Sequence, residues 1–560
     1  MKKKSTDKEL LFLPLGGAGE IGMNLNLYGY GIAGSESWIM IDLGITFSDD
    51  SLPGIDVILP DPAFIEGRRN NLLGLVLTHA HEDHIGAVQY LWRRLGCPIY
   101  ATPFTLSVLR RKLAETGILG EIDIHEIPLA GRFVVGPFAM ELITLTHSIP
   151  EPNAIAITTP VGTVMHTGDW KFDPSPVIGP TADEEALKAY GDKGILAIVC
   201  DSTNVFTPGE SGSEADILEN LVSIIGNCKG KVAVACFASN VARLETISKA
   251  AVVNDRDVVL AGRSLQRITQ AAKENGYLTK TPAFIDEREA GFLPDDRCLI
   301  ICTGSQGEPR AALSRIASGN HRNISLGMGD TVIFSSRVIP GNGPAISIMQ
   351  DKLVRQGVDI ITAKDSMIHV SGHPARDELA RMYQHIRPKI SVPVHGELRH
   401  LKAHAELALE YQVADAFVIE NGTCLKLGPG KPTVVDQVES GRLAVDGNQL
   451  IHIDSEIVRS RIQTIWHGFA VITIVVDEQG LVDEPQISTS GLFDNDKDPK
   501  LDNVRLAIRK TLDELAKSDF NDDAIVAEEI RISARRALRV ALNKRPVTRI
   551  HLVRFHKENK

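Results

Sequence analysis

The sequence predicts an α/β fold that contains an inserted α/β domain and ends in a small α/β domain. Over the first 200 residues, short apolar runs ending in turns alternate with amphipathic helical patterns, as in GLVLTHA followed by IGAVQYLWRRL. From about residue 213, helix and strand follow one another regularly, which is typical of a parallel sheet covered by helices. Between His166 and His369 there is one histidine, His321, so the middle segment is expected to have a different task.

The predicted elements divide the chain into five segments. Residues 1–210 and 366–445 are expected to form one layered domain. Residues 211–365 form the inserted domain, in which the runs KVAVACF, DVVLAG and CLIICTGS are strands between amphipathic helices. The polar stretch 446–468 is interpreted as a linker with some helix, and residues 469–560 as a separate domain in the order strand, helix, helix, strand.

The composition limits how the protein can bind a polyanion. A length of 560 residues corresponds to roughly three or four domains, enough for a substantial core. Lys and Arg number 60 against 71 Asp and Glu, a net charge of -11. This balance excludes non-specific electrostatic adhesion to nucleic acid as the main mode of binding. A polyanionic substrate must therefore be held by a local site or by metal ions.

Cysteine usage and the amino-terminal segment indicate the compartment. The seven cysteines are odd in number and lie mostly in apolar runs such as ILAIVC, which is typical of buried thiols in a reducing cytosol. There is no CxxC pair that would indicate a structural zinc site. The apolar stretch after MKKKSTDKE is too short for a signal peptide, and no run approaches the roughly 20 apolar residues of a membrane span. A cytoplasmic protein without a membrane anchor is expected.

The strongest chemical pattern is the segment LTHAHEDHIGA. His79, His81, Asp83 and His84 follow an apolar strand and precede an amphipathic helix. Residues i and i+2 at a strand end share a face, so His79 and His81 can bind one ion while Asp83 and His84 bind a second. A helix cap at Asp83 with surface histidines is the alternative, but a cap does not require three histidines.

Two further candidate ligands follow later strands. His147 ends the run FAMELITLTH, and Asp169 lies in MHTGDW. Each alone is more typical of a half-buried histidine or a turn residue. Loops at one rim of a sheet are where α/β scaffolds assemble their sites, so together with HxHxDH these residues indicate a metal centre.

These residues resemble the metallo-β-lactamase fold, an αββα sandwich. The later segments DSTN (201–204), HVSGH (369–373) and PVHGE (393–397) resemble the motifs of its β-CASP branch of nucleic-acid-processing enzymes. With FASN, TGSQGEP and SSRVIPGN added, the chain is similar to the bacterial ribonuclease J family over nearly its whole length. The carboxy-terminal domain carries no motif of its own. Arg310 departs from the family pattern, which has an apolar residue there, and leaves a detail of local packing open.

The resemblance implies two Zn²⁺ ions per subunit, with Mn²⁺ or Mg²⁺ as possible substitutes. One ion is held by three histidines, the second by one carboxylate and two histidines, and a second carboxylate bridges the two. The implied ligands are His79, His81 and His147 for the first ion, Asp83, His84 and His395 for the second, and Asp169 as the bridge. Imidazole nitrogen and carboxylate oxygen are the usual donors to hydrolytic zinc. Two ions roughly 3.5 to 4 Å apart can activate a water for displacement at phosphorus.

Catalytic roles are implied for Asp83, Asp201, His369 and His373. Asp201 would lie beside the metals and orient ligands or handle a proton. His369 and His373 would contact the scissile phosphate or assist the leaving oxygen.

The rest of the HVSGH segment is expected to contact substrate through Val370, Ser371 and Gly372. Ser371 would offer a hydroxyl group and Gly372 a backbone donor. The alternative is that the two histidines form an i, i+4 pair on an exposed helix, but Ser371-Gly372 and the following Pro374 favour a loop.

The inserted domain provides further candidate RNA contacts. Ser239 and Asn240 lie where a strand gives way to a helix, a position that directs backbone amides at an anion. The resemblance implies a pocket for a terminal 5′ phosphate there, and an ordinary helix cap is the alternative. Ser305, Ser336 and Arg337 would help to bind the RNA backbone.

Two other patterns admit a second interpretation. Residues 17–22 form a GxGxxG segment with Asp42 downstream, as in dinucleotide-binding proteins, but the strand pattern MNLNLYGYG follows it where a helix is required. The basic run at 531–545 recurs at helical spacing and could contact RNA or a partner subunit. A helix with acidic residues at its start and arginines at its end is also what the macrodipole favours.

The resemblance thus predicts a zinc-dependent ribonuclease that hydrolyses single-stranded RNA in RNA maturation and decay. It implies a 5′ to 3′ exonuclease that prefers 5′-monophosphate ends, with endonuclease activity as a further expectation, in a homodimer or homotetramer assembled through the carboxy-terminal domain with other RNA-decay proteins as partners. One alternative is a small-molecule metallohydrolase of thioester or lactam type, because the metal core alone does not define the substrate. The other is a non-catalytic scaffold for RNA degradation. The inserted domain and HVSGH argue against the first, and the complete ligand set against the second.

Overall fold

The computed structural model describes residues 7–49, 51–339 and 341–555. Residues 1–6, with the basic start of the chain, and Pro340 of the SSRVIPGN segment lie outside the described residues. Contacts between residues divide the chain into two compact units. The first draws on Met1–Thr46 and Leu59–Gly441, and the second on Phe47–Ile58 and Arg442–Lys560.

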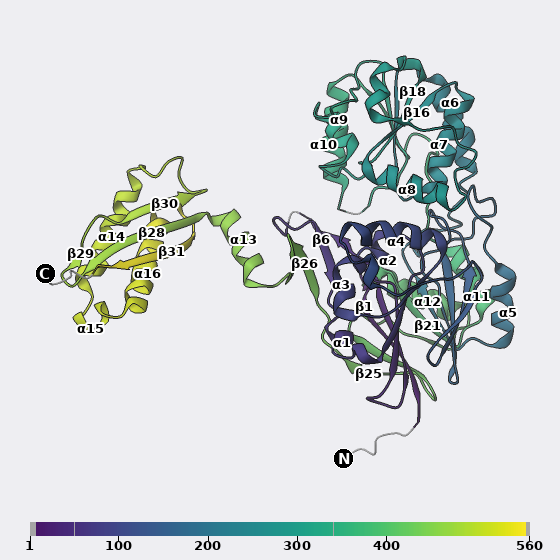
Figure 1. The fold of residues 1–560 in the computed structure, drawn as a ribbon, viewed down its shortest axis with the longest axis horizontal. Coiled ribbons are helices and arrows are strands. Elements are labelled where there is room, and N and C mark those ends of the chain that lie inside the picture. The colour runs from purple at the N-terminus through teal and green to yellow at the C-terminus, as the bar shows by residue number, and fades with distance from the viewer. Residues whose placement is uncertain (1–6, 50, 340, 556–560) are drawn as a thin grey trace. The chain divides into compact units, whose positions relative to one another are not determined.

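Two large sheets form the centre of the first unit (Figure 1). The eight-stranded sheet contains, in spatial order, β25 (Thr433–Gln437), β24 (Thr423–Gly428), β1 (Glu9–Gly16), β3 (Leu25–Gly31), β4 (Ser37–Ile41), β7 (Leu72–Val76), β8 (Ile99–Ala101) and β9 (Ile124–Glu126). The seven-stranded sheet contains β10 (Arg132–Val135), β11 (Phe138–Thr144), β12 (Asn153–Thr159), β13 (Gly162–His166), β14 (Ala197–Asp201), β21 (Ile390–Val394) and β23 (Asp415–Ala416).

The two sheets share a core between their facing sides. Phe12 of β1 and Ile39 of β4 pack in one cluster with Ile155 of β12 and Val199 of β14, all fully buried. Helices α5 (Glu184–Lys193), α11 (Arg376–Ile386) and α12 (Leu398–Glu410) cover the outer face of the seven-stranded sheet. Helices α1 (Ala63–Glu66), α3 (Val88–Leu95) and α4 (Pro103–Glu115) lie on the opposite side (Figure 1). The predicted αββα sandwich is confirmed.

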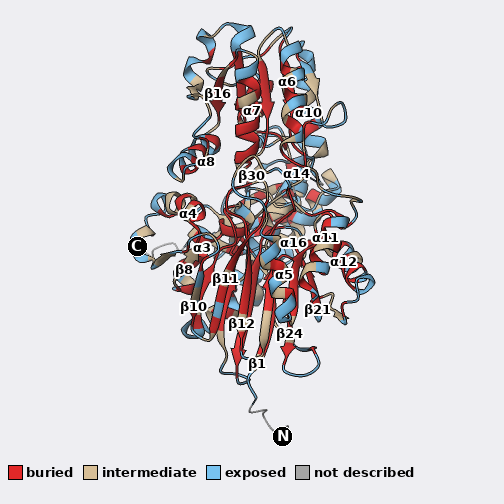
Figure 2. Cartoon of the chain, turned by 90° about the vertical axis from the view of Figure 1, so that its right-hand side faces the viewer, coloured by how far each residue is buried: buried red, intermediate tan, exposed pale blue. Residues whose placement is uncertain are grey.

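The inserted domain has a six-stranded sheet in which every pairing is parallel. Its spatial order is β17 (Ile285–Asp286), β16 (Asp257–Ala261), β18 (Cys298–Cys302), β15 (Val232–Ala235), β19 (Thr331–Phe334) and β20 (Asp359–Ile361). The helices are α6 (Asp216–Asn227), α7 (Val241–Val253), α8 (Arg263–Glu274), α9 (Ala312–Ala317) and α10 (Gly343–Arg355). Figure 2 shows the strands and most of α7 as buried, whereas α6, α8 and α10 also carry exposed residues. Because the strands are covered on both faces, their sequences are almost wholly apolar.

The second unit contains a small sheet and the carboxy-terminal domain. The sheet consists of β27 (Gln449–His452), β26 (Arg442–Asp446), β6 (Val57–Pro60) and β5 (Thr46–Phe47), and α13 (Glu456–His467) follows it in sequence. The segment 446–468 therefore holds a strand and a helix.

In the carboxy-terminal domain, the strand β28 (Phe469–Asp477) pairs with three others. These are β29 (Gly480–Leu481), β30 (Gln486–Ser490) and β31 (Val547–Arg554), and the helices are α14 (Lys500–Glu514), α15 (Lys517–Phe520) and α16 (Asp523–Leu542). The order strand, helix, helix, strand omits β30, because its sequence QISTS buries only one apolar side chain, Ile487. The predicted domain boundaries at 210, 365, 445 and 468 stay predictions.

Several of the weaker sequence patterns have plain outcomes. No helix follows the glycine segment at 17–22, since the chain continues into β3, which pairs antiparallel with β1. The dinucleotide interpretation is thereby excluded.

All seven cysteines are free, and all but Cys228 are buried. Arg310 is exposed. Within the described residues, none of the helices has the length and apolar composition needed to cross a bilayer.

Candidate metal centre

The first group of candidate ligands comes from three loops that follow strands. His79 and His81 lie between β7 and α2 (Glu82–Ile85), His147 follows β11, and Asp169 follows β13. Nδ1 of His81 lies 3.0 Å from Nε2 of His79 and 3.1 Å from Nε2 of His147. Oδ2 of Asp169 lies 3.9 Å from both of those Nε2 atoms. Four donor atoms therefore converge on one point.

The second group shares Asp169 with the first. It adds Asp83 and His84 from α2 and His395, which follows β21. Nε2 of His84 lies 3.2 Å from Oδ2 of Asp169 and 3.5 Å from Oδ2 of Asp83. His395 places Nδ1 3.4 Å from Oδ1 of Asp169 and Nε2 3.7 Å from Oδ2 of Asp83. The structure thus brings together all seven predicted ligands, with Asp169 in the middle.

Hydrogen bonds on the far side of three imidazoles determine which nitrogen faces the centre. Nδ1 of His79 lies 3.0 Å from Oγ1 of Thr78, and Nδ1 of His84 donates to Oδ2 of Asp42 at 2.7 Å. Nδ1 of His147 donates to the carbonyl oxygen of Gly372 at 2.5 Å. Such outward bonds fix the ring orientation of metal-binding histidines and leave Nε2 as the donor to an ion.

The electrostatics of the site favour neutral imidazoles in the first group. Burial, reinforced by neighbouring histidines, lowers the pKa of His79 and of His147 well below the ordinary value. Burial also lowers the pKa of His81 to about 4, despite the nearby carboxylates. Burial acts to lower the pKa of His84 as well, but the surrounding carboxylates, led by that of Asp169, raise it well above the ordinary value. The raised pKa means that, without a metal ion, the ring of His84 keeps a second proton. A bound cation would replace this proton at Nε2.

These side chains fit metal ions. Oδ1 of Asp169 is buried and has no hydrogen-bond partner among the described residues, which is costly unless something else satisfies it. In the first group, Nδ1 of His81 lies 3.0 to 3.1 Å from Nε2 of His79 and of His147. Donors to one tetrahedral zinc at about 2.05 Å lie roughly 3.3 Å apart, so an ion would satisfy the unpartnered oxygen and account for the short distances between these nitrogens.

The glycine segment at 17–22 supports this site. The strand β2 (Ala18–Gly19) pairs in parallel with β22 (Gly396–Glu397), and the carbonyl oxygen of Gly17 accepts a hydrogen bond from the backbone nitrogen of His395 at 2.6 Å. His395 has a φ of 53°, a left-handed conformation that a non-glycine residue keeps only when its surroundings hold it. The glycine segment therefore holds the backbone of the candidate ligand His395 in place.

Asp201 and His373 form a pair at the edge of the ligand groups. Oδ2 of Asp201 accepts a hydrogen bond from Nδ1 of His373 at 2.8 Å, and Oδ1 accepts two from Thr203. Nδ1 of His373 is also 3.9 Å from Oδ2 of Asp169. Burial acts to lower the pKa of His373, but Asp201 and Asp169 raise it to about 9.

The HVSGH segment is a loop, so the alternative of an exposed helical pair is wrong. Val370 is buried, and Oγ of Ser371 accepts a hydrogen bond from Nδ2 of Asn204 at 2.6 Å. Gly372 lies so close to His147 that an added Cβ would meet the imidazole ring at 2.7 Å. His369 is half-buried. Desolvation together with nearby positive charges, first that of Arg243, lowers its pKa to about 3.

The candidate RNA contacts of the inserted domain share one sheet edge. Ser239 follows β15, Ser305 follows β18, and Ser336 and Arg337 follow β19, three neighbouring parallel strands. Their carboxyl ends meet at one edge, which is where open α/β sheets bind ligands. Nη1 of Arg337 donates to Oδ1 of Asn204 at 2.5 Å, which joins this edge to the DSTN segment.

The helix-cap interpretation of Asn240 is confirmed, because its side chain accepts a hydrogen bond from the backbone nitrogen of Arg243 at 2.8 Å. The structure describes no ligand, so a phosphate contact by Ser239 stays a prediction.

Three residues that support the site were not predicted as part of it. Asp42, the acidic residue of the apparent dinucleotide pattern, orients His84. Nδ2 of Asn24 lies 3.2 Å from Nε2 of His84 and 3.1 Å from Nδ1 of His395. Gln306, in the TGSQGEP segment, donates to the carbonyl oxygen of Arg337 at 2.8 Å. In the sequence, the only sign that these three residues support the site is their position within or beside glycine-rich segments.

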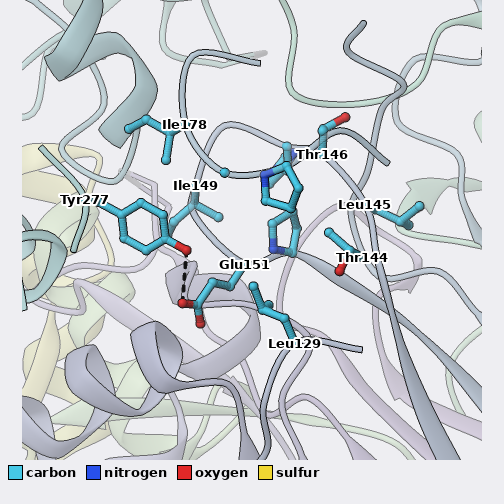
Figure 3. A pocket seen from close by; sticks show the side chains of 12 residues that line it. Leu129, Thr144, Leu145, Thr146, Ile149, Glu151, Ile178 and Tyr277 are labelled. Carbon is cyan, nitrogen blue, oxygen red and sulfur yellow. Dashed lines mark hydrogen bonds between the residues drawn. The ribbon is translucent and has the colours of Figure 1, made fainter. Parts of the chain in front are cut away.

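A pocket lies beside His147 (Figure 3). Leu145, Ile149, Glu151 and Tyr277 are among its lining residues. The hydroxyl group of Tyr277, from the inserted domain, donates to Oε1 of Glu151 at 3.1 Å, and the backbone nitrogen of Phe104 donates to Oε2 at 2.8 Å. The loop that carries His147 is thereby tied to α4 and to the inserted domain.

A buried carboxylate, that of Glu378, ties three loops of the first unit together. It accepts hydrogen bonds from the backbone nitrogens of Phe172, Ser211 and Ala375, each at 2.8 Å. Hydrogen bonds to a buried charge contribute about 1.5 to 3 kcal/mol each, so Glu378→Gln should lower the free energy of unfolding by at least about 3 kcal/mol. Glu210→Gln, at an exposed neighbour, should change it by less than about 0.5 kcal/mol. Urea unfolding of both variants tests this, and equal midpoints would contradict the proposed tether.

Comparisons with known proteins identify the family. Four family models match successive parts of the chain: the metallo-beta-lactamase superfamily at residues 29–211, the ribonuclease J beta-CASP domain at 229–353, the Zn-dependent metallo-hydrolase RNA specificity domain at 357–418, and the ribonuclease J C-terminal domain at 456–555. A crystal structure of a protein of unknown function from Enterococcus faecalis has a TM-score of 0.51 at 16% identity, covering 75% of this chain and 100% of that one, and shows the fold alone.

Relatives align along most of the chain. Ribonuclease J of Sinorhizobium meliloti is 42% identical over 98% of both chains. Ribonuclease J 1 of Streptococcus pyogenes is 38% identical over 86% of both, and ribonuclease J of Corynebacterium glutamicum is 37% identical over 97% of this chain and 76% of its own. The chain therefore belongs to the ribonuclease J family of metal-dependent hydrolytic ribonucleases.

Proposed function

We propose that this protein holds two zinc ions per subunit and uses them to hydrolyse phosphodiester bonds of single-stranded RNA. The observation that carries the proposal is the pair of ligand groups that share Asp169. When bound, two zinc ions would lower the pKa of a water and stabilise charge on the phosphoryl oxygens. The first ion would be held by His79, His81 and His147, the second by Asp83, His84 and His395, with Asp169 between them.

The chain's own residues would then handle the substrate and the proton. Asp201 accepts from Nδ1 of His373 at 2.8 Å, which leaves Nε2 of His373 to hold a proton for the leaving oxygen. The low pKa of His369 keeps its ring neutral, so it would donate a hydrogen bond to a phosphate oxygen without carrying charge. The hydroxyl oxygen of Ser371 accepts from Nδ2 of Asn204, and the carbonyl oxygen of Gly372 accepts from Nδ1 of His147, so both contacts shape this loop. The backbone nitrogen of Gly372 would donate to a phosphate oxygen from it.

The direction of attack follows from the inserted domain. Ser239 precedes the amino end of α7, a helix of 13 residues, where backbone amides and the helix dipole favour an anion. A 5′ monophosphate bound there makes the enzyme a 5′ to 3′ exonuclease that prefers monophosphorylated ends. Endonuclease cleavage would occur when RNA reaches the metal centre without its 5′ end bound at the amino end of α7.

The assay that tests this function uses single-stranded RNA of one sequence with a 5′ monophosphate or a 5′ triphosphate, with and without a chelator. We expect chelator-sensitive release of mononucleotides, faster from the monophosphorylated RNA. Hydrolysis of a small thioester or lactam with no cleavage of either RNA would contradict the substrate and favour a small-molecule hydrolase.

Replacing Ser239 tests the 5′ phosphate contact. Ser239→Ala should reduce the ratio of rates on monophosphorylated and triphosphorylated RNA by about tenfold, since one hydrogen bond to a charged group contributes about 1.5 kcal/mol. Ser223→Ala, on an exposed helical position of the same domain, should leave the ratio unchanged. An unchanged ratio in Ser239→Ala would remove Ser239 from the pocket.

Three further expectations belong to the same proposal. The protein acts in the cytoplasm, on RNA that is matured or degraded there with other decay proteins. The carboxy-terminal domain, which matches the family's own model, assembles a homodimer or homotetramer. Mn²⁺ or Mg²⁺ supports activity when it replaces zinc.

A further inference from the structure

Arg243 of α7 is fully buried, which is rare for an arginine. Its Nε and Nη2 atoms donate to the two carboxylate oxygens of Glu214 at 2.6 and 3.0 Å. Its Nη1 atom donates to Oγ of Ser335 at 2.6 Å, to the carbonyl oxygen of Ser335 at 2.9 Å and to the carbonyl oxygen of Ile368 at 3.1 Å. One guanidinium group therefore joins four segments of the chain.

Stability alone does not explain this arrangement. Removing two charges from water costs several kcal/mol per ion, and well-packed apolar residues often give equal or greater stability. What an apolar replacement cannot provide is the rigid fork of donors that fixes several backbone atoms at once. Arg243 therefore differs from an apolar residue chiefly in fixing the positions of those backbone atoms.

The segments that Arg243 joins are those that carry the candidate RNA contacts. Its own backbone nitrogen donates to the capping side chain of Asn240, next to Ser239. Ser335 directly precedes Ser336 and Arg337, and Ile368 directly precedes His369.

His369 depends on this anchoring more than the other candidate residues. Its buried Nδ1 atom finds no hydrogen-bond partner among the described residues, so no side-chain bond at that atom fixes the ring. The main chain must therefore place it. The carbonyl oxygen of the preceding residue, Ile368, is held both by Arg243 and by Oγ of Ser335, which donates to it at 2.7 Å.

The partner carboxylate connects the same anchor to the metal centre. The backbone nitrogen of Glu214 donates to Oδ2 of Asp173 at 3.0 Å, four residues after the bridging candidate Asp169. Lys171, between them, forms a buried ion pair with Asp173 at 3.0 Å and donates to the carbonyl oxygen of Gly212 at 2.9 Å. The segment that enters the inserted domain is thus held against the loop of Asp169.

We propose that Arg243, paired with Glu214, is a positioning residue that holds His369 in register with the amino end of α7, with Ser336 and Arg337, and with the metal centre. It touches no substrate and acts through His369. This inference rests on the proposed function, because it assigns Arg243 a part in RNA hydrolysis.

The test compares two buried arginines of the inserted domain. Arg243→Lys keeps the charge but loses the fork. Arg256→Lys makes the same change at an arginine that donates to the carbonyl oxygens of Gly230, Cys228 and Cys298, away from the candidate RNA contacts. We expect Arg243→Lys to lower kcat on monophosphorylated RNA at least twentyfold with wild-type zinc content. Arg256→Lys should lower kcat less than twofold. This difference in kcat is expected even if the two variants have similar melting temperatures.

A double-mutant cycle separates positioning from a general loss of structure. If Arg243 acts through His369, then Arg243→Lys combined with His369→Ala should have the same kcat as His369→Ala alone. Ser335→Ala, which removes one of the two donors to Ile368, should lower kcat in the same direction and serves if Arg243→Lys does not fold. The inference would be overturned if the reductions in kcat multiplied in the double variant, or if the two lysine variants lowered kcat equally. The proposed function would still stand as long as the wild-type protein cleaves RNA. A wild-type protein that cleaves no RNA would overturn both.

Discussion

Asp169→Asn is expected to lower the rate of RNA hydrolysis by about a thousandfold or more. Asp169 is the one side chain common to both groups of predicted metal ligands, and it is buried. A neutral amide at this position cannot bridge two cations. Metal ions contribute several kcal/mol of transition-state stabilisation, and each 1.36 kcal/mol is a factor of ten in rate. Initial rates on monophosphorylated RNA, measured with zinc content, test this expectation.

The control for Asp169→Asn is the same change at Asp123. Asp123 also pairs with a histidine, His125, at 3.0 Å, but both side chains are exposed. An exposed pair contributes about 1 kcal/mol or less, so Asp123→Asn should leave activity and stability near the wild-type values. A rate above one tenth of wild type in Asp169→Asn, with two ions still bound, would contradict the bridging role.

His373→Gln is expected to lower kcat by about 100- to 10,000-fold, the contribution typical of a general acid or base. Its hydrogen bond to Asp201 aligns the ring beside Asp169, and glutamine cannot hold or release a proton there. Zinc content should stay at the wild-type level, because His373 lies outside both of the predicted ligand sets. Single-turnover kinetics on monophosphorylated RNA measure the chemical step directly.

A second histidine–carboxylate pair provides the control for His373. Nε2 of His385, on α11, donates to Oε2 of Glu184, on α5, at 2.7 Å. This pair lies between two helices that cover the outer face of the seven-stranded sheet, and His385→Gln should change kcat by less than twofold. If His373→Gln kept wild-type kcat, the proton would have to come from another group.

The candidate ligands could be predicted from sequence because most of them come in short patterns. His79, His81, Asp83 and His84 lie within six residues, and the end of one strand is enough to gather them. Their supports could not be predicted in the same way. Asp42 lies 42 residues from His84, and the contact between His147 and the carbonyl of Gly372 spans 225 residues. Only the folded chain shows which distant group completes a ligand's hydrogen bonds.

The fold was predictable where strands are buried on both faces and uncertain where they are not. The inserted sheet shows as apolar runs such as CLIIC, every residue of which is buried. In β25, by contrast, the five residues TVVDQ are all exposed, and in β30 only one is buried, so neither has the apolar run or alternation of a typical strand. The glycine pattern at 17–22 needed the structure as well, because its partner is the distant loop of His395.

Metal analysis of the purified protein, combined with RNA hydrolysis before and after chelation, tests the shared metal centre most directly. We expect two zinc ions per chain, loss of hydrolysis when a chelator removes them, and recovery in proportion to the second ion restored. Full activity with one ion or none per chain, or hydrolysis that a chelator leaves unchanged after the metal is removed, would contradict the two-ion site built around Asp169.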